Sequence, residues 1–225
     1  MNRNDGNGRR AQRPTRGRGD VLSLLADKPF PHTRNPFAPL EPLTAEQIEA
    51  IHNASMTILE EIGVDFLDGE ALDLWAAAGA RVERSTSHVY IDRGLLMALL
   101  ATVPAQFTLR ARDPARNLTV GGSHINFATV GGAPFYSDLE SGRRPGPLAD
   151  FRRMVQLAHL CGPIHIVEGL LVEPQDLPVP VRHLDKALAQ FTLSDKAMTA
   201  AAHGREVAAD YIAMAAIVYG GLEGV

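Results

Sequence analysis

The second half of the chain alternates apolar strands with helices, and this alternation restricts the possible folds more than any other feature. Helices are predicted over residues 146–162, 179–193 and 205–221, and the apolar runs IHIVEGLLV (164–172) and KAMTAAAHG (196–204) lie between them. Strands separated by helices of 10–15 residues indicate βαβ units and a parallel sheet. An open doubly wound sheet and a β/α barrel both satisfy this pattern.

The first half of the chain begins with a well-marked helix, LTAEQIEAIHNASMTILEEIG. Thr44 is placed as its N-cap with Gln47 three residues later, which forms a capping box, and Gly63 ends it. Apolar side chains recur every three or four residues and predict one face along the helix, which comprises Ile48, Ile51, Ser55, Ile58 and Ile62.

Short local elements follow this helix. A second helix is predicted over residues 68–78, ARVERS and HVYID are typical of short strands, and Asp92 caps a third helix. Residues 106–138 then alternate with the period of two that favours β-strands. This part of the chain is therefore expected to form a helical and β lead-in to the β/α units.

Composition is ordinary for a globular protein: of 225 residues, 45% are hydrophobic and 21% are charged. No apolar run approaches the roughly 20 residues that span a bilayer, so no membrane partner is expected. The single cysteine, Cys161, excludes an internal disulfide and a cysteine-based zinc site, and it fits a cytoplasmic location.

Positive charge is concentrated at the N-terminus. Residues 1–20 hold six arginines against two aspartates, a net charge of +4, so the rest of the chain carries −8. We expect residues 1–35, rich in Arg, Gly and Pro, to be a disordered tail and lead-in. The acidic remainder argues against nucleic acid as a partner.

Candidate substrate-binding side chains come from the strand ends and from the segment before the first predicted unit. In parallel β/α folds, side chains at the carboxyl ends of strands point into the site, which selects Glu168, Glu173 and His203. The segment VGGAPFYSDLESGRRPG and the strand before it add an aromatic and acidic group, namely Phe127, Phe135, Tyr136 and Asp138.

Aromatic rings beside carboxylates suit a cation, because ring faces attract ammonium groups by about 0.5–2 kcal/mol per contact. The alternative is that the rings belong to the core and the acids to a solvated rim. No histidine pattern predicts a metal site, and His165 is expected to be a core histidine with satisfied hydrogen bonds. No catalytic residue is predicted.

Three segments resemble the N-terminal half of the trimethylamine methyltransferase family: LTAEQIEAIHNASMTILEEIGVDF, VGGAPFYSDLESGRRPGPLADF and SDKAMTAAAHG. The motifs I-H-x-A-S-M-x-I-L-E-E-I-G-V and G-G-x-P-x-Y-x-x-D-x-x-S-G-R-R-P-G within them are long and unusual, which makes the resemblance specific. It covers residues 36–225 and leaves the Arg-rich tail outside.

The resemblance implies a (β/α)₈ TIM-type barrel, of which residues 36–225 would form the N-terminal part. It implies methyl transfer from a methylated amine, such as trimethylamine or a quaternary amine like glycine betaine, to the Co(I) of a corrinoid. The corrinoid (cobalamin type) would be carried by a partner protein, as in methanogenesis-type one-carbon metabolism. The aromatic and acidic residues would then line the barrel mouth and grip the methylated ammonium group.

The sequence is also consistent with other substrates and other functions. Chains of this family extend well beyond the present length, and a pyrrolysine lies in the second half of the trimethylamine-specific members. The sequence alone does not choose between tertiary and quaternary amines. A truncated, non-catalytic half-barrel is the alternative, acting as a subunit or homo-oligomer or surviving as a remnant. The third hypothesis is an α/β enzyme of unrelated function.

Overall fold

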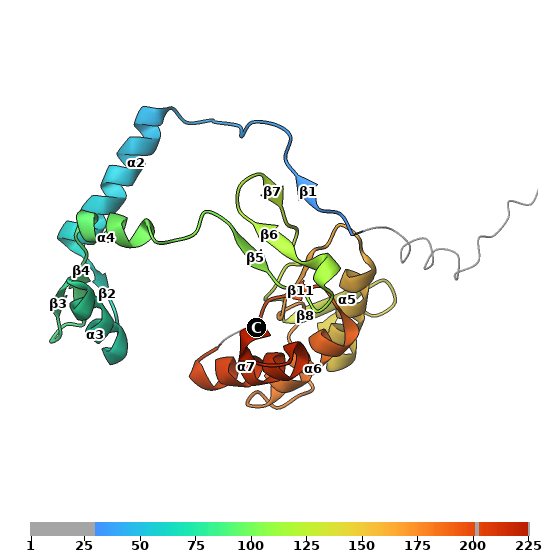
Figure 1. Ribbon diagram of the computed structural model, residues 1–225. Helices are drawn as coiled ribbons and strands as arrows, with labels where there is room; N and C mark the ends of the chain where they lie inside the picture. Colours follow the sequence, from blue (N-terminus) through green and yellow to red (C-terminus); the bar gives the residue numbers. More distant parts are fainter. Residues whose placement is uncertain (1–29, 201–202, 225) are drawn as a thin grey trace, which may run out of the picture. The chain divides into compact units, whose positions relative to one another are not determined.

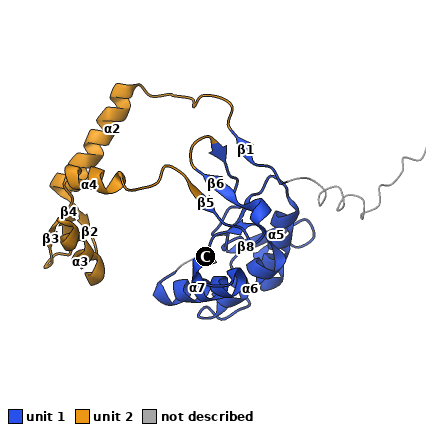
Figure 2. Ribbon diagram, viewed as in Figure 1, with its two compact units in different colours: residues 1–34, 108–120, 124–225 blue, residues 35–107, 121–123 orange. Residues whose placement is uncertain are grey.

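The computed structural model describes residues 30–200 and 203–224, so the predicted tail over residues 1–29 lies outside the described part. The chain divides into two compact units (Figure 2). Unit 1 comprises Met1–Arg34, Thr108–Val120 and His124–Val225, and unit 2 comprises Asn35–Phe107 and Gly121–Ser123.

Unit 2 is built from helices around a small antiparallel sheet in the order β2-β4-β3. Its elements are α2 (Ala45–Thr57), η1 (Ile58–Ile62), β2 (Val64–Asp65), α3 (Gly69–Ala78), β3 (Arg81–Glu83), β4 (His88–Tyr90) and α4 (Arg93–Leu100). Leu72, Val89 and Ile91 form its buried core.

The predicted helix signals of unit 2 are confirmed. Thr44 and Gln47 form the capping box at the start of α2, and Asp68 and Asp92 accept backbone hydrogen bonds at the starts of α3 and α4. The predicted isoleucine face of α2 is not covered in the structure, since its exposed fractions range from 48% at Ile58 to 63% at Ile62.

Unit 1 begins with short strands and hairpins and continues with alternating strands and helices (Figure 1). Its early elements are β1 (Thr33–Arg34), β5 (Phe107–Leu109, which crosses the boundary with unit 2), η2 (Pro114–Arg116), β6 (Leu118–Val120), β7 (His124–Ile125), β8 (Phe135–Asp138) and β9 (Gly142–Pro145). Its later elements are α5 (Leu148–Leu160), β10 (Ile166–Val167), α6 (Arg182–Leu193), β11 (Ala197–Met198), α7 (Arg205–Tyr219) and η3 (Leu222–Gly224).

Parallel pairing organises unit 1. Strands β10 and β11 pair in parallel, and Ala128 joins Ile166 through a further parallel bridge. The chain therefore runs strand, α5, strand, α6, strand, α7, with its strand segments side by side in the same direction. The predicted β/α units are present in the described residues, and the fold class is mixed α/β.

The two faces of this parallel sheet are covered differently. Val167 packs against Phe151 and Val155 of α5 and Ala189 of α6, so this face belongs to the helices. Residues alternate between faces along a strand, and Ile166 accordingly packs on the other side with Ala197, Leu118 and Phe30. Glu168, two residues beyond Ile166, shares that second face.

A buried lysine closes the C-terminal end of α5. Lys196 is 1% exposed, and its Nζ donates to the carbonyl oxygens of Ala158 (2.8 Å), Cys161 (2.6 Å) and Ile164 (2.6 Å). Ala158 lies in the last turn of α5, Cys161 directly follows the helix, and Ile164 lies in the loop before β10, so one ammonium joins the helix end to this loop. Burial lowers the pKa of the Lys196 ammonium to about 8.

His165 ties residues at the beginning of the described chain to the parallel sheet, as predicted for a satisfied core histidine. Its Nδ1 accepts the Phe127 amide at 3.0 Å, and its Nε2 lies 2.8 Å from the carbonyl oxygen of Pro31. These partners fix the neutral tautomer with the proton on Nε2. Burial lowers the pKa of His165 below its usual value.

No helix among the residues described is both long enough and apolar enough to cross a membrane.

We predict that Lys196→Met lowers the free energy of unfolding by about 2–4 kcal/mol, because three carbonyls in the last turn of α5 and the loop after it lose a shared, buried donor. Urea unfolding followed by circular dichroism measures the change. Arg152 is an exposed cation of α5. Arg152→Met is therefore the matched control and should shift the free energy of unfolding by no more than about 0.5 kcal/mol. Equal effects in both variants would contradict the assigned role.

We also predict that His165 contributes a loss of stability as the pH drops from 7 to 5.5. The folded-state pKa of His165 is depressed, so the unfolded chain takes up more protons below about pH 6.5, and unfolding becomes easier. Urea unfolding at several pH values should show a shallower slope in His165→Gln. The slope should persist in His52→Gln, which changes an exposed histidine of α2.

Candidate functional site

Glu168 lies at the carboxyl end of the central segment of the parallel sheet. It directly follows β10, whose neighbours are Ala128 on one side and β11 on the other. The side chain shares the sheet face opposite the helices, and it is half-buried. In β/α folds this end of the strands carries the reacting groups, so the position predicted from the sequence for Glu168 agrees with its place in the fold.

Hydroxyl groups from both neighbouring segments hold Glu168. The Thr199 hydroxyl donates to its Oε2, and its own amide donates to Oγ1 of Thr129 at 2.9 Å. Among the described residues no donor hydrogen-bonds the second carboxylate oxygen, Oε1. The arrangement presents one anionic oxygen at the carboxyl edge of the sheet.

The predicted aromatic and acidic stretch forms a β-hairpin. Strand β8 pairs with β9 so that Tyr136 faces Arg144 and Asp138 faces Gly142. The guanidinium of Arg143 lies 3.6 Å from the ring centroid of Phe135, and that of Arg144 lies 4.9 Å from the ring of Tyr136. In this structure the aromatic pair therefore already has cations above it, supplied by its own hairpin.

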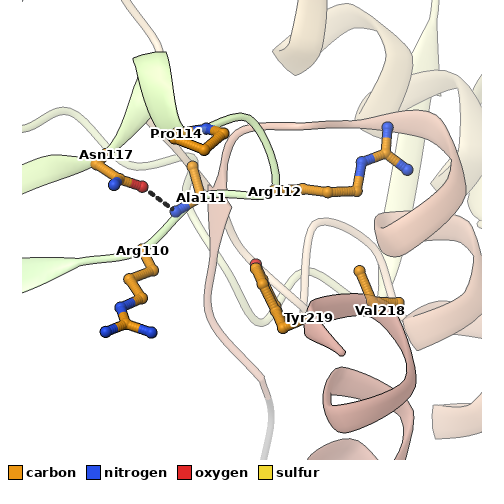
Figure 3. Close-up of a pocket in the computed structure, with 7 residues that line it drawn as sticks. All are labelled: Arg110, Ala111, Arg112, Pro114, Asn117, Val218 and Tyr219. Atoms are coloured by element: carbon orange, nitrogen blue, oxygen red, sulfur yellow. Dashed lines mark hydrogen bonds between the residues drawn. The ribbon is translucent and has the colours of Figure 1, made fainter. Parts of the chain in front are cut away.

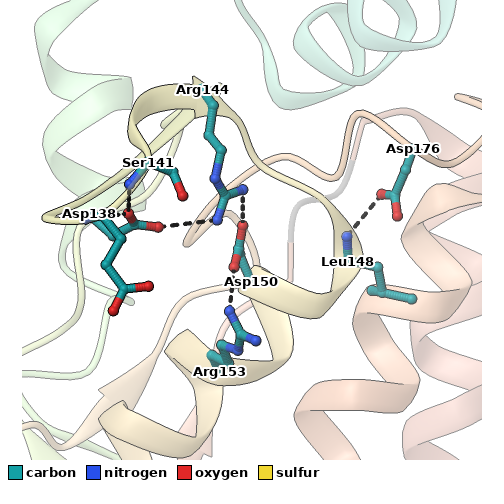
Figure 4. Close-up of polar contacts among 8 residues, drawn as sticks. Asp138, Ser141, Arg144, Leu148, Asp150, Arg153 and Asp176 are labelled. Carbon is teal, nitrogen blue, oxygen red and sulfur yellow. Dashed lines mark hydrogen bonds and ion pairs between the residues drawn. The ribbon is translucent and has the colours of Figure 1, made fainter.

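An ion-pair network connects this hairpin to α5 (Figure 4). Arg144 contacts both Asp138 at 3.3 Å and Asp150, which is 1% exposed, at 2.5 Å. Arg153 approaches the other oxygen of Asp150 at 3.2 Å. The hydrogen bond from the Ser141 amide lowers the pKa of Asp138, and the hydrogen bond from Arg144 lowers it further. The hydrogen bond to Asp150 raises the pKa of Arg144. Asp138 thus closes the turn and anchors the hairpin.

Glu173, predicted as a binding residue, lies within a cluster of cations from α6. Its carboxylate meets Arg182 at 3.3 Å and the buried Lys186 at 2.7 Å, and its amide donates to the Ala133 carbonyl at 2.9 Å. Burial beside this cluster raises the pKa of Tyr211 to about 12. Two cations already balance the charge of Glu173, which suits a role in holding its loop against α6.

The two remaining predicted residues lie apart from these clusters. Phe127 stacks on His165 at a centroid distance of 6.0 Å and is half exposed. His203 is exposed and precedes α7. The structure therefore does not bring all the predicted residues together in one cluster. Among the three predicted acidic residues, Glu168 has no cationic partner in the described part of the chain.

A pocket of about 530 Å³ lies elsewhere in unit 1 (Figure 3). Its lining residues are Arg110, Ala111, Arg112, Pro114, Asn117, Val218 and Tyr219, none of them predicted from the sequence. Val218 and Tyr219 belong to the last turn of α7, and helices of β/α units end at the amino edge of the sheet. The pocket therefore lies toward the edge opposite Glu168.

No group of three or more His, Cys, Asp or Glu side chains in the residues described could hold a metal ion.

A sequence profile of the trimethylamine methyltransferase family matches residues 5–223. The chain belongs to this family. The match begins within the Arg-rich segment, so the expectation that the tail lies outside the resemblance is wrong. Because both units fall within the match, the lead-in helices of unit 2 are part of the family's architecture as much as the β/α units are.

Several relatives within this family have names that state an activity. The chain is 39% identical to a glycine betaine methyltransferase of Desulfitobacterium hafniense strain Y51 over 179 residues, which cover 80% of this chain and 37% of that protein. It is 25% identical to the trimethylamine methyltransferase MttB of strain DSM 10664 / DCB-2 over 183 residues, 78% of this chain and 36% of that protein. An L-carnitine:corrinoid methyltransferase of Eubacterium limosum is 39% identical over 79 residues, 35% of this chain and 15% of that protein.

The chain thus spans little more than a third of the length of the first two relatives. The homologues are methyltransferases by name, and the chain belongs with them as a methyltransferase-family protein. Sequence reasoning missed Thr129 and Thr199, because an isolated threonine in a strand gives no signal of its own before the strand pairing is known.

We predict that Arg144→Gln lowers the unfolding temperature of unit 1 by several degrees, because the buried Asp150 loses its shortest cationic contact. Thermal unfolding followed by circular dichroism reports the loss. Arg143 lies next in sequence and also covers an aromatic ring but is exposed, so Arg143→Gln should cost about 0.5 kcal/mol. A larger loss in Arg143→Gln than in Arg144→Gln would refute the network's importance.

Proposed function

We propose that the natural protein containing this chain moves a methyl group from a methylated amine to the cobalt of a corrinoid carried by a partner protein. The observation that carries the proposal is the Glu168 carboxylate, unpaired by any described cation at the carboxyl edge of a parallel β/α sheet. Family membership and the names of the relatives support the reaction class. We further propose that the sheet is the first part of a TIM-type barrel.

Glu168 is suited to attract the ammonium group of the substrate. Its Oε2 is held by Thr199, whereas no donor among the described residues hydrogen-bonds Oε1. A carboxylate and an ammonium attract each other strongly in a half-buried setting, where less water screens the charges than at the surface. Aromatic rings near a barrel mouth would add to the attraction by about 0.5–2 kcal/mol each.

The attraction between Glu168 and the ammonium group changes in strength during methyl transfer. The partner's Co(I) supplies the electron pair of the new cobalt–carbon bond, while the pair of the breaking carbon–nitrogen bond stays on nitrogen. The positive charge on nitrogen therefore disappears as the methyl group leaves. Glu168 stabilises the bound substrate more than the transition state, so it contributes to substrate capture rather than to the chemical step.

A quaternary amine is the substrate class that we propose. The glycine betaine methyltransferase matches 80% of this chain at 39% identity, compared with 25% identity over a similar share for the trimethylamine enzyme. Quaternary ammonium carries a permanent charge, which a carboxylate attracts without a proton having to be shared.

The hairpin side chains remain candidates for the rim of the site. Phe135 and Tyr136 already carry arginines above their rings, and Asp138 already pairs with Arg144. We propose that Glu168 contacts the ammonium group directly, while Phe127, Phe135, Tyr136, Asp138, Glu173 and His203 shape the surrounding loops.

We predict that Glu168→Gln raises KM for the methylated amine about 10- to 100-fold, because an amide no longer attracts the ammonium charge. The value of kcat should stay the same or rise, because part of that charge is lost in the transition state and the bound substrate therefore loses more stabilisation than the transition state does. Steady-state assays of corrinoid methylation over a panel of amines, using the natural gene product that contains this chain, measure both constants.

Glu140→Gln is the matched control for this test, because Glu140 is an exposed carboxylate of the hairpin turn. It should leave both constants unchanged. A wild-type KM in Glu168→Gln would remove Glu168 from the site, and failure of every amine in the panel would remove the substrate class.

A further inference from the structure

We infer that Thr199 and Gln190 are positioning residues for Glu168, and that they determine which of its carboxylate oxygens faces the substrate. This inference rests on the proposed function, because it assigns roles to residues around the same carboxylate. It adds residues on a neighbouring strand and helix to the site, and neither of them need touch the substrate.

Thr199 fixes the carboxylate from the adjacent strand. It directly follows β11, and its hydroxyl donates to Oε2 of Glu168 across the sheet. A glutamate side chain has several rotatable bonds, and holding one oxygen removes most of their freedom before substrate arrives. The site then loses less conformational entropy on binding than a free carboxylate would.

Thr129 fixes the backbone of Glu168 from the opposite side. Its Oγ1 accepts the Glu168 amide at 2.9 Å, and its own amide donates to the Ile166 carbonyl at 3.2 Å. The main chain of Glu168 is therefore held by one neighbouring segment while its carboxylate is held by the other. Rotation of the side chain away from the carboxyl edge would break the contact with Thr199.

Gln190 of α6 ties together the two strands that carry this contact. It is 0% exposed, and its Nε2 donates to the carbonyl oxygens of Val167 and Thr199, each at 3.2 Å. Val167 immediately precedes Glu168. The Thr199 amide also donates to the Val167 carbonyl at 3.2 Å, so the Gln190 amide reinforces a backbone bond that already joins the segments carrying the hydroxyl donor and the carboxylate acceptor.

The remaining atom of this amide supports a positional role. Oε1 of Gln190 is buried and has no hydrogen-bond partner among the residues described. A buried acceptor without a partner is unfavourable for stability, and an apolar side chain of similar size would avoid that cost. The two bonds from Nε2 account for a polar residue at this place, because no apolar side chain could link the strands in that way.

The test uses the natural gene product that contains this chain. We compare Thr199→Val, which removes the hydroxyl and keeps the shape, with Thr199→Ser, which keeps the hydroxyl. Calorimetry measures affinity for glycine betaine and for tert-butylacetate, which has the same shape and carboxylate but no positive charge. The ratio of the two affinities reports how well Glu168 recognises the ammonium group.

We expect Thr199→Val to lower that ratio about 3- to 10-fold and to raise KM by a similar factor with kcat unchanged or higher, and Thr199→Ser to restore both the ratio and KM. Gln190→Met should change the ratio in the same direction. Thr192→Val is the control, because the Thr192 hydroxyl is exposed and donates to Leu188 within α6. It should leave the ratio at the wild-type value.

The outcomes separate the inference from the proposed function. A normal ratio in Glu168→Gln would overturn the assignment of Glu168 and the inference with it. A reduced ratio in Glu168→Gln with a normal ratio in Thr199→Val would overturn the inference alone. A Thr199→Val protein that is less thermally stable but keeps its ratio would show a merely structural hydroxyl and would equally overturn it.

Discussion

The parallel hydrogen bonding among the segment at Ala128, β10 and β11 is the constraint on which the candidate site depends. Parallel strands end at the same edge, so pairing alone brings together residues that are far apart in the chain, such as Thr129 and Thr199. The sheet is narrow, and buried polar side chains reinforce it from both ends. Lys196 holds the helix end at the amino edge, and Gln190 ties the carboxyl edge.

Glu168 differs from three other acidic residues of unit 1 in how its charge is balanced. Asp138, Asp150 and Glu173 all have arginine or lysine partners, and their contacts fasten loops to helices. Glu168 instead receives a neutral hydroxyl, which restricts its position but does not cancel its charge. A carboxylate kept in this way remains able to attract a cation from outside the chain, whereas a salt-bridged one would first have to lose its partner.

Much of the fold was predictable because the signals are local. Thr44, Asp68 and Asp92 mark helix starts through hydrogen bonds only a few residues long, and all three are confirmed. The position of Glu168 at the end of a strand was predictable from the apolar run before it. Its threonine partners were not, because their role depends on strand pairing. The arginines above Phe135 and Tyr136 depend on hairpin register, which alternation alone does not specify.

Unit 2 is inserted into unit 1, and this has a consequence for biosynthesis. Residues 35–107 form local contacts and can fold as soon as they leave the ribosome, whereas Phe30 and Pro31 must wait for partners as distant as His165. Contacts of such sequence separation form slowly because a long loop must close first. We therefore expect unit 2 to be structured while Phe30 and Pro31 are still unpaired, so that completion of the parallel sheet is the late step in folding.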